Sequence, residues 1–359
     1  MRIAIDASRT TVARVTGTER YALELIRALI AQNTQHDLHL YFRDTPAPDL
    51  LPSSPRITPH VIPFRRAWTH ARFAAALWTA RPDLTFVPAH TLPFAFPGRA
   101  MVTVHDLGYR LFPQAHTWAG WAYLDATTRY SSARADIVLA DSQATARDLA
   151  RFYRTPEHKI HVVYPGVTAP VIGDVAAVRA KYDLPQRYWL FVGTLQPRKN
   201  IAALVQGYAR WRAQSGDDAA LVLAGGRGWL YDPAWTAGVD GVIETGYIDE
   251  ADKGALYAGA LGLLFPSLYE GFGFPVLEAM HCGTPVICSS SSSLPEVGGD
   301  AALYVPLLDD PAAMADALAA QMAQVVGTPM VSRLRERGRA QAAQFTWSRA
   351  AERVLSLLG

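Results

Sequence analysis

Residues 261–288 read LGLLFPSLYEGFGFPVLEAMHCGTPVIC, and this stretch holds one complete strand–helix–strand unit. The apolar run Leu261–Phe265 predicts a buried strand. Pro275 suits the first position of a helix, where its missing N–H costs nothing, and Gly283 suits the residue that closes the helix. A second apolar run at Pro285–Cys288 predicts the next strand. The stretch therefore favours a parallel sheet with a helix packed on one face.

The same alternation of short β-rich runs and longer Ala/Leu-rich stretches continues along the whole chain. It predicts parallel sheets with helices on both faces. In the first half, strands are expected at Ile3–Asp6, Leu38–Phe42, Leu84–Val87, Met101–Val104, Ile137–Ala140 and Ile160–Val163, and helices at Gly17–Gln32, Thr69–Ala80 and Ser142–Phe152. In the second half, strands are expected at Tyr188–Val192, Ala219–Ala224 and Val242–Glu244, and helices at Asn200–Ala213, capped by Asn200, Glu250–Gly259, Pro275–Cys282 and Thr346–Leu358.

A Pro- and Gly-containing stretch at Tyr164–Pro170 separates the two halves and indicates a domain boundary. The chain has 359 residues, which suits two domains. We predict an α/β protein with two doubly wound, Rossmann-like domains that face a central cleft. The domains are residues 1–170 and 171–345, followed by a terminal helical segment at 346–359. Parallel sheets bind ligands at the carboxyl ends of their strands.

Cysteine usage and hydropathy indicate the compartment. The chain has two cysteines, which suggests a reducing environment, and no apolar run of about 18 residues. We therefore expect a cytoplasmic protein without a transmembrane helix. Residues 1–170 carry 19 Lys/Arg against 13 Asp/Glu, and Pro63–Trp78 is both apolar and basic. That stretch suits either a helix packed on its own domain or a peripheral contact with the inner membrane face.

The loop between the strand and the helix of residues 261–288 carries the strongest chemical signal. It presents Glu270 and the backbone of Gly271, Phe272, Gly273 and Phe274 at the start of a helix, where N–H groups and the helix dipole attract anions. Glu278 is expected in the first turn of this helix. A capping acid is the alternative for Glu278. Ser289–Ser293 is expected to be a flexible loop that lines the cleft.

Three further segments add candidate residues. Arg198 and Lys199 precede a helix and suit a diphosphate, although two solvated surface cations are the alternative. No Asp-x-Asp pair occurs, so no divalent-metal site is expected.

His105 ends an apolar strand and would lie at the edge of the sheet, where it could contact a ligand or serve as a structural histidine. His90 is a weaker candidate of the same kind. Gly17, in Val15–Tyr21, would let a phosphate approach closely.

With these residues, the chain resembles the retaining glycosyltransferases of family 4 (group 1), which have the GT-B fold. The likeness is specific over residues 185–320, and it is nearest to the branch that transfers mannose. It includes Val192–Asn200, Glu244–Ile248, Leu256–Ala260 and Ser293–Asp300, and the run 265–286. In the first half it is limited to Gly17, Arg20-Tyr21 and Val104–Asp106. Many relatives carry Arg where this sequence has Thr194, which weakens the assignment of the diphosphate site.

This resemblance implies a role for each candidate residue. Glu270 would contact the transferred sugar, with the backbone of Phe272–Phe274 nearby, and Glu278 would hold the ribose hydroxyls. Arg198 and Lys199 would hold the diphosphate, and Gly17 would approach it. His105 would form a hydrogen bond with the sugar or with the positive centre that develops during the reaction. The terminal helix would cross back to the N-terminal domain.

The resemblance also implies substrates. The donor would be a nucleoside-diphosphate sugar, with GDP-mannose the first expectation, and no cofactor would be needed. The acceptor, a glycan or a lipid-linked sugar, would bind the N-terminal domain.

The alternatives are a sugar-nucleotide epimerase, a phosphorylase of this fold and a non-enzymatic carbohydrate-binding protein. A phosphorylase would need a lysine for pyridoxal phosphate, and none of the four lysines has such a setting. A dinucleotide dehydrogenase is disfavoured, since no Gly-x-Gly-x-x-Gly follows the first strand. Nucleic acid is not an expected partner.

Overall fold

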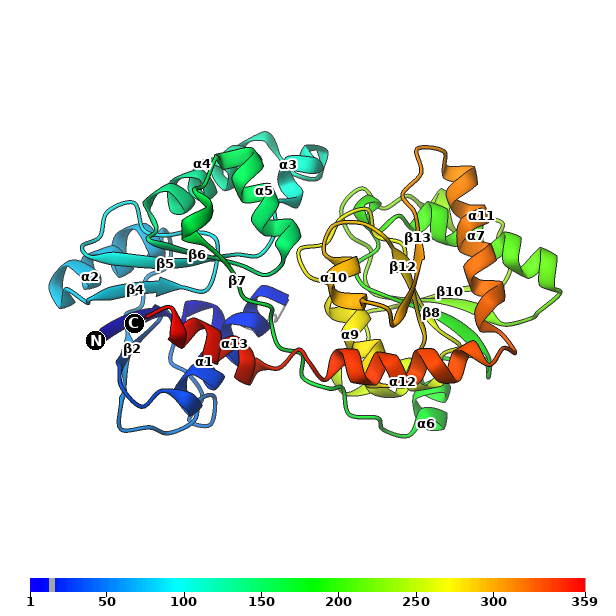
Figure 1. Cartoon of the computed structure of the whole chain (residues 1–359), viewed down its shortest axis with the longest axis horizontal. Helices are drawn as coiled ribbons and strands as arrows, with labels where there is room; N and C mark the ends of the chain where they lie inside the picture. The colour runs from blue at the N-terminus through cyan, green and yellow to red at the C-terminus, as the bar shows by residue number, and fades with distance from the viewer. Residues whose placement is uncertain (13–16, 359) are drawn as a thin grey trace. The chain divides into compact units, whose positions relative to one another are not determined.

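The structure, a computed structural model, describes residues 1–12 and 17–358 (Figure 1). Tertiary contacts divide the chain into two compact units. The first comprises Met1–Gly166 together with Phe345–Gly359, and the second comprises Val167–Gln344. The domain limits expected from the sequence fall after residues 170 and 345. Each unit is built on an all-parallel sheet with helices around it, so the predicted α/β class with two Rossmann-like domains is confirmed.

The sheet of the first unit has seven strands in the order β3-β2-β1-β4-β5-β6-β7. Six of these strands were predicted from their apolar runs. The seventh, β3, was missed because Pro59 interrupts it and its side chains are largely exposed, as suits an edge strand. The strands are β1 (Arg2–Asp6), β2 (Asp37–Phe42), β3 (Ile57–Val61), β4 (Leu84–Val87), β5 (Arg99–Val104), β6 (Ile137–Ala140) and β7 (Ile160–Val162).

The helices of the first unit depart from prediction in two places. The helix expected at Thr69–Ala80 begins with a turn of π-helix at Trp68–Phe73 and continues as α2 (Ala74–Ala80). A long helix, α4 (Trp118–Arg134), was missed because its apolar residues do not repeat at the helical period. The other helices are α1 (Gly17–Gln32), α3 (Gly108–Leu111), α5 (Gln143–Tyr153) and α13 (Trp347–Ser356), with 3₁₀ turns at Ser8–Thr11, Pro113–Ala115 and Glu157–Lys159.

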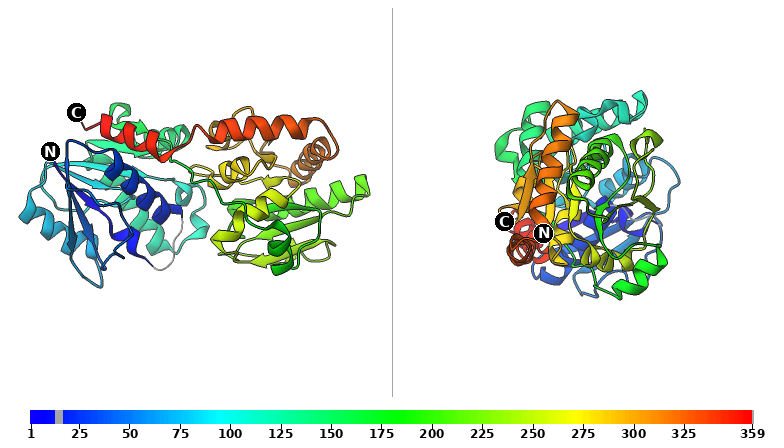
Figure 2. Two further views of the ribbon diagram at one scale, coloured as in Figure 1. Left: turned by 90° about the horizontal axis from the view of Figure 1, so that it is seen from below. Right: turned by 90° about the vertical axis from the view of Figure 1, so that its right-hand side faces the viewer.

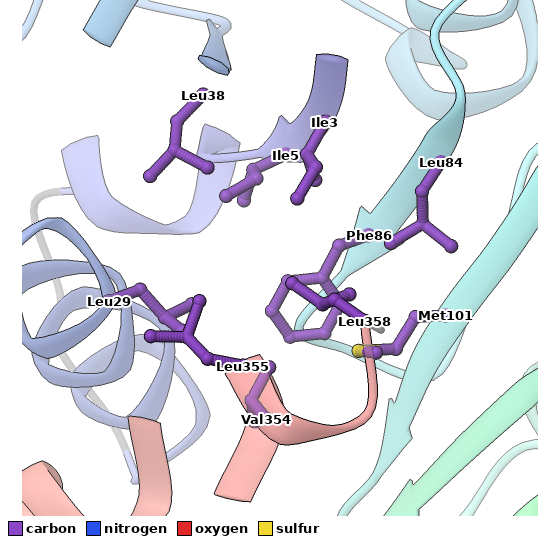
Figure 3. Close-up of a pocket in the computed structure, with 10 residues that line it drawn as sticks. All are labelled: Ile3, Ile5, Leu29, Leu38, Leu84, Phe86, Met101, Val354, Leu355 and Leu358. Carbon is purple, nitrogen blue, oxygen red and sulfur yellow. The ribbon is translucent and has the colours of Figure 1, made fainter. Parts of the chain in front are cut away.

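The terminal helix α13 is an integral part of the first unit, where it packs beside α1 (Figures 1 and 2). Val354 and Leu355 of this helix, and Leu358 just after it, meet apolar residues of β1, β2, β4 and β5 around a small apolar pocket (Figure 3). Burial of these side chains from both ends of the sequence stabilises the unit through the hydrophobic effect. A second core on the opposite face of the sheet includes Phe73 and Leu77.

The sheet of the second unit has six strands in the order β10-β9-β8-β11-β12-β13. Its central strand β8 is buried at every position, as expected for a parallel sheet covered on both faces. The edge strand β13 was not predicted, and two of its four positions are only partly buried, as suits an edge strand. The strands are β8 (Tyr188–Val192), β9 (Ala220–Ala224), β10 (Val242–Gly246), β11 (Leu263–Phe265), β12 (Val286–Ser289) and β13 (Ala302–Val305).

Two predicted details of the second unit's helices are wrong. Asn200 precedes α7 with a left-handed φ of 57° and its side chain makes no capping hydrogen bond; its amide instead contacts the sulfur of Met314. The helix α9 starts at Phe274, one residue before Pro275. The helices are α6 (Val175–Lys181), α7 (Ile201–Ser215), α8 (Lys253–Gly259), α9 (Phe274–His281), α10 (Leu294–Gly298), α11 (Pro311–Val325) and α12 (Met330–Ala342), with 3₁₀ turns at Pro197–Lys199, Pro233–Trp235 and Glu250–Asp252.

Among the helices that the structure describes, none combines the length and the apolar character needed to cross a membrane.

Candidate functional site

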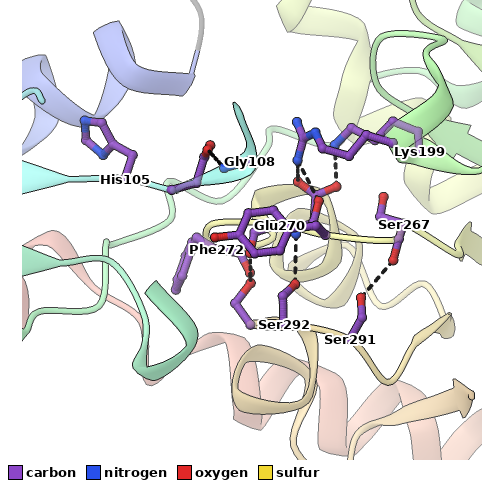
Figure 4. Close-up of polar contacts among 12 residues, drawn as sticks. His105, Gly108, Lys199, Ser267, Glu270, Phe272, Ser291 and Ser292 are labelled. Atoms are coloured by element: carbon purple, nitrogen blue, oxygen red, sulfur yellow. Dashed lines mark hydrogen bonds and ion pairs between the residues drawn. The ribbon is translucent and has the colours of Figure 1, made fainter. Parts of the chain in front are cut away.

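Glu270 is the centre of the predicted site in the second unit, and two cations flank its carboxylate (Figure 4). The Lys199 ammonium lies 2.5 Å from Oε1, and Nη1 of Arg198 lies 3.2 Å from Oε2. All three side chains are mostly buried. Arg198 also donates to the carbonyl of Tyr269 at 2.6 Å, and its own carbonyl accepts from the N–H of Leu268. The structure thus brings the expected sugar ligand and both expected diphosphate ligands into one cluster.

The electrostatics of this cluster keep the carboxylate ionised. Burial raises the pKa of Glu270, but the Lys199 ammonium and the Arg198 guanidinium outweigh burial, so that the pKa is held below its usual range. Two cations thus contact this one carboxylate. A buried positive charge next to a backbone loop is suited to an anionic ligand.

Four serines, one at the end of β12 and three just after it, hold the Glu270 loop in place (Figure 4). The hydroxyl of Ser292 accepts from the N–H of Glu270 at 2.8 Å. Ser293 Oγ lies 3.0 Å from the carbonyl of Glu270 and 2.6 Å from that of Phe272. Ser289 and Ser291 donate to the carbonyl of Ser267. The sequence had indicated a flexible loop here. The correction is that these hydroxyls are bonded, since the carbonyls of a tight loop need donors that its own backbone does not supply.

The backbone of Gly271–Phe274 connects Glu270 to the first turn of α9. Gly273 adopts φ = 122°, which L side chains rarely occupy, and a Cβ there would lie 2.9 Å from a methyl of Leu294. Phe272 is buried and meets Phe274 edge-on, with ring centroids 5.1 Å apart. The predicted glycine-rich entry to the helix is therefore a requirement of the fold as well as a candidate ligand surface.

Glu278 lies in the second turn of α9, not in the first turn, because the helix begins at Phe274. Its carboxylate is nearly buried and has two neighbours from α8. The Tyr257 hydroxyl donates to Oε2 at 2.9 Å, and Nζ of Lys253 lies 3.5 Å from Oε1. Burial and the Glu278 carboxylate raise the pKa of Tyr257 well above its usual value, so Tyr257 stays a donor. Sequence reasoning missed both neighbours.

In the first unit, His105 directly follows β5 and meets an unpredicted partner. Its Nδ1 lies 2.7 Å from Oδ2 of Asp141, and both residues are buried. Burial alone would lower the pKa of His105, but the Asp141 carboxylate outweighs it and the pKa is raised. The ring of Tyr21 contacts the imidazole edge-on at 4.7 Å between centroids. Nε2 of His90 accepts from the backbone N–H of His105 at 3.1 Å, and burial lowers the pKa of His90 to about 4.

A signal for Asp141 was present in the sequence. Val104 and Ala140 are register partners in β5 and β6. His105 and Asp141 are the next residues of these strands, and parallel strands end at the same edge of a sheet.

Gly17 is the first residue of α1 and is exposed. A Cβ on Gly17 would meet no heavy atom within 4 Å among the residues that the structure describes. Packing against those residues therefore does not demand glycine. Val15 and Thr16 of the predicted Val15–Tyr21 segment lie outside the described residues. Over residues 1–12 and 17–358, no group of three or more His, Cys, Asp or Glu side chains is arranged to hold a metal ion.

Known proteins match both units. A family model described as "Glycosyltransferase Family 4" matches residues 15–169, and one described as "Glycosyl transferases group 1" matches residues 176–343. The chain is 31% identical to O-antigen chain mannosyltransferase B of Escherichia coli over 370 aligned residues, which cover 95% of each chain.

Two solved structures show the same fold. Sucrose-phosphate synthase from Thermosynechococcus elongatus superimposes with a TM-score of 0.75 at 24% identity, over 99% of this chain and 98% of that one. Anabaena HepE, solved in complex with UDP-glucose, gives a TM-score of 0.71 at 14% identity over 99% of each chain. At these identities the likeness concerns the fold alone.

Proposed function

Because the chain belongs to the group 1 glycosyltransferases of family 4, we propose that it transfers a mannosyl group from GDP-mannose to a hydroxyl of a glycan or lipid-linked acceptor. The transfer retains the anomeric configuration and needs neither a metal ion nor a cofactor. The name of the Escherichia coli relative supports mannose as the sugar. GDP as the carrier follows from the resemblance in sequence.

The observation that carries this proposal is the cluster of Arg198, Lys199 and Glu270. Its ammonium and guanidinium lie in a mostly buried setting, where charge-assisted hydrogen bonds are stronger than in water. An ammonium and a guanidinium placed there would neutralise the negative charge that grows on a departing nucleoside diphosphate. Stabilisation of charge in the transition state is the largest contribution such a reaction needs.

The contacts of Glu270 also favour one course of reaction. Its two oxygens are engaged by Lys199 and Arg198 respectively, so the carboxylate is poorly placed to serve as a hydrolase-type nucleophile. Instead, the acceptor oxygen would form a bond to the anomeric carbon as the bond to the diphosphate oxygen breaks. The acceptor proton would pass to that departing oxygen. Attack and departure on one face retain the configuration.

The remaining residues are assigned supporting roles. Glu278 would hold the ribose hydroxyls, oriented by the hydrogen bond from Tyr257. His105, oriented by Asp141, would bond the sugar, and Gly17 would leave room for the diphosphate. The backbone of Gly271–Phe274 would face the sugar or its phosphates. The second unit is the proposed donor side and the first the acceptor side, with the cytoplasm as the expected compartment.

The test begins with thermal unfolding against a panel of nucleoside diphosphates and their sugars, in EDTA. Ligand at a hundredfold excess over its Kd stabilises the folded state by about 2.7 kcal/mol, which is readily measured. We expect stabilisation by GDP and GDP-mannose, lost in Lys199→Ala and Glu278→Ala and kept in the surface variant Arg335→Gln. The anomeric configuration of the product is then read by NMR.

Other results would change the proposal. Stabilisation by a different base would replace GDP and leave the reaction class intact. Donor turnover without any acceptor would indicate an epimerase. Absence of stabilisation by every nucleotide, with and without Mg²⁺, would exclude the assigned donor site and favour a carbohydrate-binding protein.

A further inference from the structure

His90 connects the end of β4 to the residue that follows β5. The register of the two strands pairs Val87, the last residue of β4, with Val102. Because β5 continues to Val104, His105 lies beyond the hydrogen-bond ladder between these strands. Nε2 of His90 takes the place of a ladder carbonyl and accepts from the backbone N–H of His105 at 3.1 Å. His105 is buried, so its N–H needs an acceptor, and here a side chain supplies it.

Three other side chains hold His105, each from a different element. The hydroxyl of Thr145 on α5 donates to its carbonyl at 3.1 Å, and Asp141 after β6 meets its Nδ1 at 2.7 Å. Tyr21 of α1 packs edge-on against the imidazole. Together with His90, these contacts fix both main-chain polar groups and the ring of one residue. Functional side chains need such support, because small errors of placement remove much of their effect.

The hydrogen bond also decides the protonation of His90. Only an unprotonated ring nitrogen accepts, so neutral His90 carries its proton on Nδ1. Burial lowers the pKa of His90 to about 4; the His105 imidazole and Arg9 also lower it, and Asp106 opposes them. Burial opposes ionisation of His105 as well, but the Asp141 carboxylate outweighs burial and raises its pKa. In weak acid the positive charge is therefore on His105, while His90 remains a neutral acceptor.

We propose that His90 is a positioning residue for the transfer reaction: its neutral imidazole holds the backbone N–H of His105, so that the His105 side chain meets the sugar. The inference rests on the contact between His105 and the sugar that belongs to the proposed function. An unpaired buried N–H is unfavourable. Without Nε2 of His90, the chain after β5 would move until this N–H found another acceptor, and the imidazole that Asp141 holds would move with it.

Three substitutions of His90 separate the effects of its two ring nitrogens. The amide oxygen of glutamine can occupy the position of Nε2, whereas the shorter asparagine reaches only the position of Nδ1, and leucine has no acceptor. Transfer is measured from GDP-mannose to a methyl mannoside. We expect His90→Gln to keep kcat/KM within about threefold of wild type, and His90→Asn and His90→Leu to lose about 10- to 100-fold.

Two further readouts follow the hydrogen bond and the donor site directly. Hydrogen exchange of the His105 amide, measured by NMR, should remain slow in His90→Gln and become faster in the other two variants. Thermal stabilisation by GDP should be equal in all variants, because the residues assigned to hold the ribose and the diphosphate charge lie in the second unit. A loss confined to transfer would thus point to the placement of His105.

The matched control is Asn33→Leu, which removes the side-chain acceptor of another buried N–H in the first unit, that of His36. Asn33 precedes β2, so it lies at the opposite edge of the parallel sheet from His90. We expect this variant to be less stable but to have an unchanged kcat/KM. If it loses as much activity as His90→Leu, the loss reflects stability alone and the inference is overturned.

Two other results would also overturn the inference. One is a His90→Gln variant that is no more active than His90→Leu. The other is activity kept in His90→Asn and lost in His90→Gln, since Nδ1 would then contact the substrate directly. If the wild type transfers no sugar, the proposed function fails by itself. The exchange data then still test the anchor, and slow exchange of the His105 amide in His90→Leu would reject it.

Discussion

Lys199 and Glu270 are 71 positions apart in sequence, yet the ammonium of one lies 2.5 Å from Oε1 of the other. Strand order explains the encounter. Lys199 follows β8 and Glu270 follows β11, and these two strands are neighbours in the sheet, with Leu190 and Leu263 in register. The loops at their carboxyl ends therefore meet at one edge.

The first prediction concerns the stability of this pair. Lys199→Met leaves the buried Glu270 carboxylate with Arg198 alone, and we expect it to lower the free energy of unfolding by about 3 kcal/mol. Glu270→Gln in the same chain removes the stranded charge and should recover most of that loss. Urea unfolding of both variants measures this. Neither should bind the nucleotide sugar in the thermal assay. Recovery of donor binding in the double variant would contradict the assigned role of Lys199.

The second prediction is a dependence of stability on acid. The pKa of Glu270 is lowered in the folded protein, so its ion pairs contribute stability that is fully present above the ordinary value of 4.5. That contribution is lost as pH falls through the lower folded-state pKa. We expect the difference in unfolding free energy between wild type and Glu270→Gln to be constant above about pH 5.5 and to shrink in more acid solution. Urea unfolding between pH 4 and 7 gives this curve. A difference that does not change with pH would contradict the ion pairing.

The sequence predicted the members of this cluster but not their contacts. Glu270 stood out because a strand, a glycine-rich loop and a helix start follow one another, all of which are local patterns. The pairing of Lys199 with Glu270 depends on which strands are neighbours, and strand order is not written in local patterns. The same limit applies to Asp141, which meets His105 in the first unit, and to Tyr257, which meets Glu278 in the second. The serines at 289–293 were misread because composition alone does not show which carbonyls a hydroxyl will meet.

The fold was predictable where burial makes a strand uniformly apolar. The central strands β8 and β11 are of this kind. Prediction failed for β3, which contains Pro59 and is largely exposed, and for α4, whose buried positions are Thr and Ser. An edge strand and a helix packed through hydroxyl side chains lack the apolar periodicity on which such predictions rest.

The third prediction tests the orientation of Glu278. Tyr257→Phe removes the hydroxyl that donates to Oε2 and should lower the free energy of unfolding by about 1–2 kcal/mol. If Glu278 holds the ribose, the KM for the donor should rise while kcat changes little, because the lost binding is common to ground and transition states. Tyr188→Phe is the matched control: its buried hydroxyl donates to the carbonyl of Leu256, outside the candidate site. An equal rise of KM in both variants would mean that Tyr257 acts only on stability.

The fourth prediction concerns the ionisation of His105. The Asp141 carboxylate raises the pKa of His105 above 6.5, whereas burial alone would lower it. Asp141→Asn keeps the shape and removes the charge, so the pKa of His105 should fall below 6.5. Titration of the imidazole ¹⁵N resonances measures both proteins, with His105→Gln to assign the signals. If the orientation of His105 matters for transfer, the asparagine variant should also have a lower kcat. An unchanged pKa would show that Asp141 is not the group that governs this histidine.

The fifth prediction separates packing from ligand binding at Gly17. A Cβ there meets nothing within 4 Å in the described chain, and alanine is a better helix former than glycine. Gly17→Ala should therefore leave the free energy of unfolding unchanged or slightly higher. If a diphosphate approaches this helix start, the added methyl group occupies the space that the phosphate needs, and the Kd for the nucleotide sugar should rise about tenfold or more. Titration calorimetry beside urea unfolding tests the two parts independently. A variant that is stable and binds the donor as well as wild type would remove Gly17 from the site, and would leave the second unit to bind the donor without it.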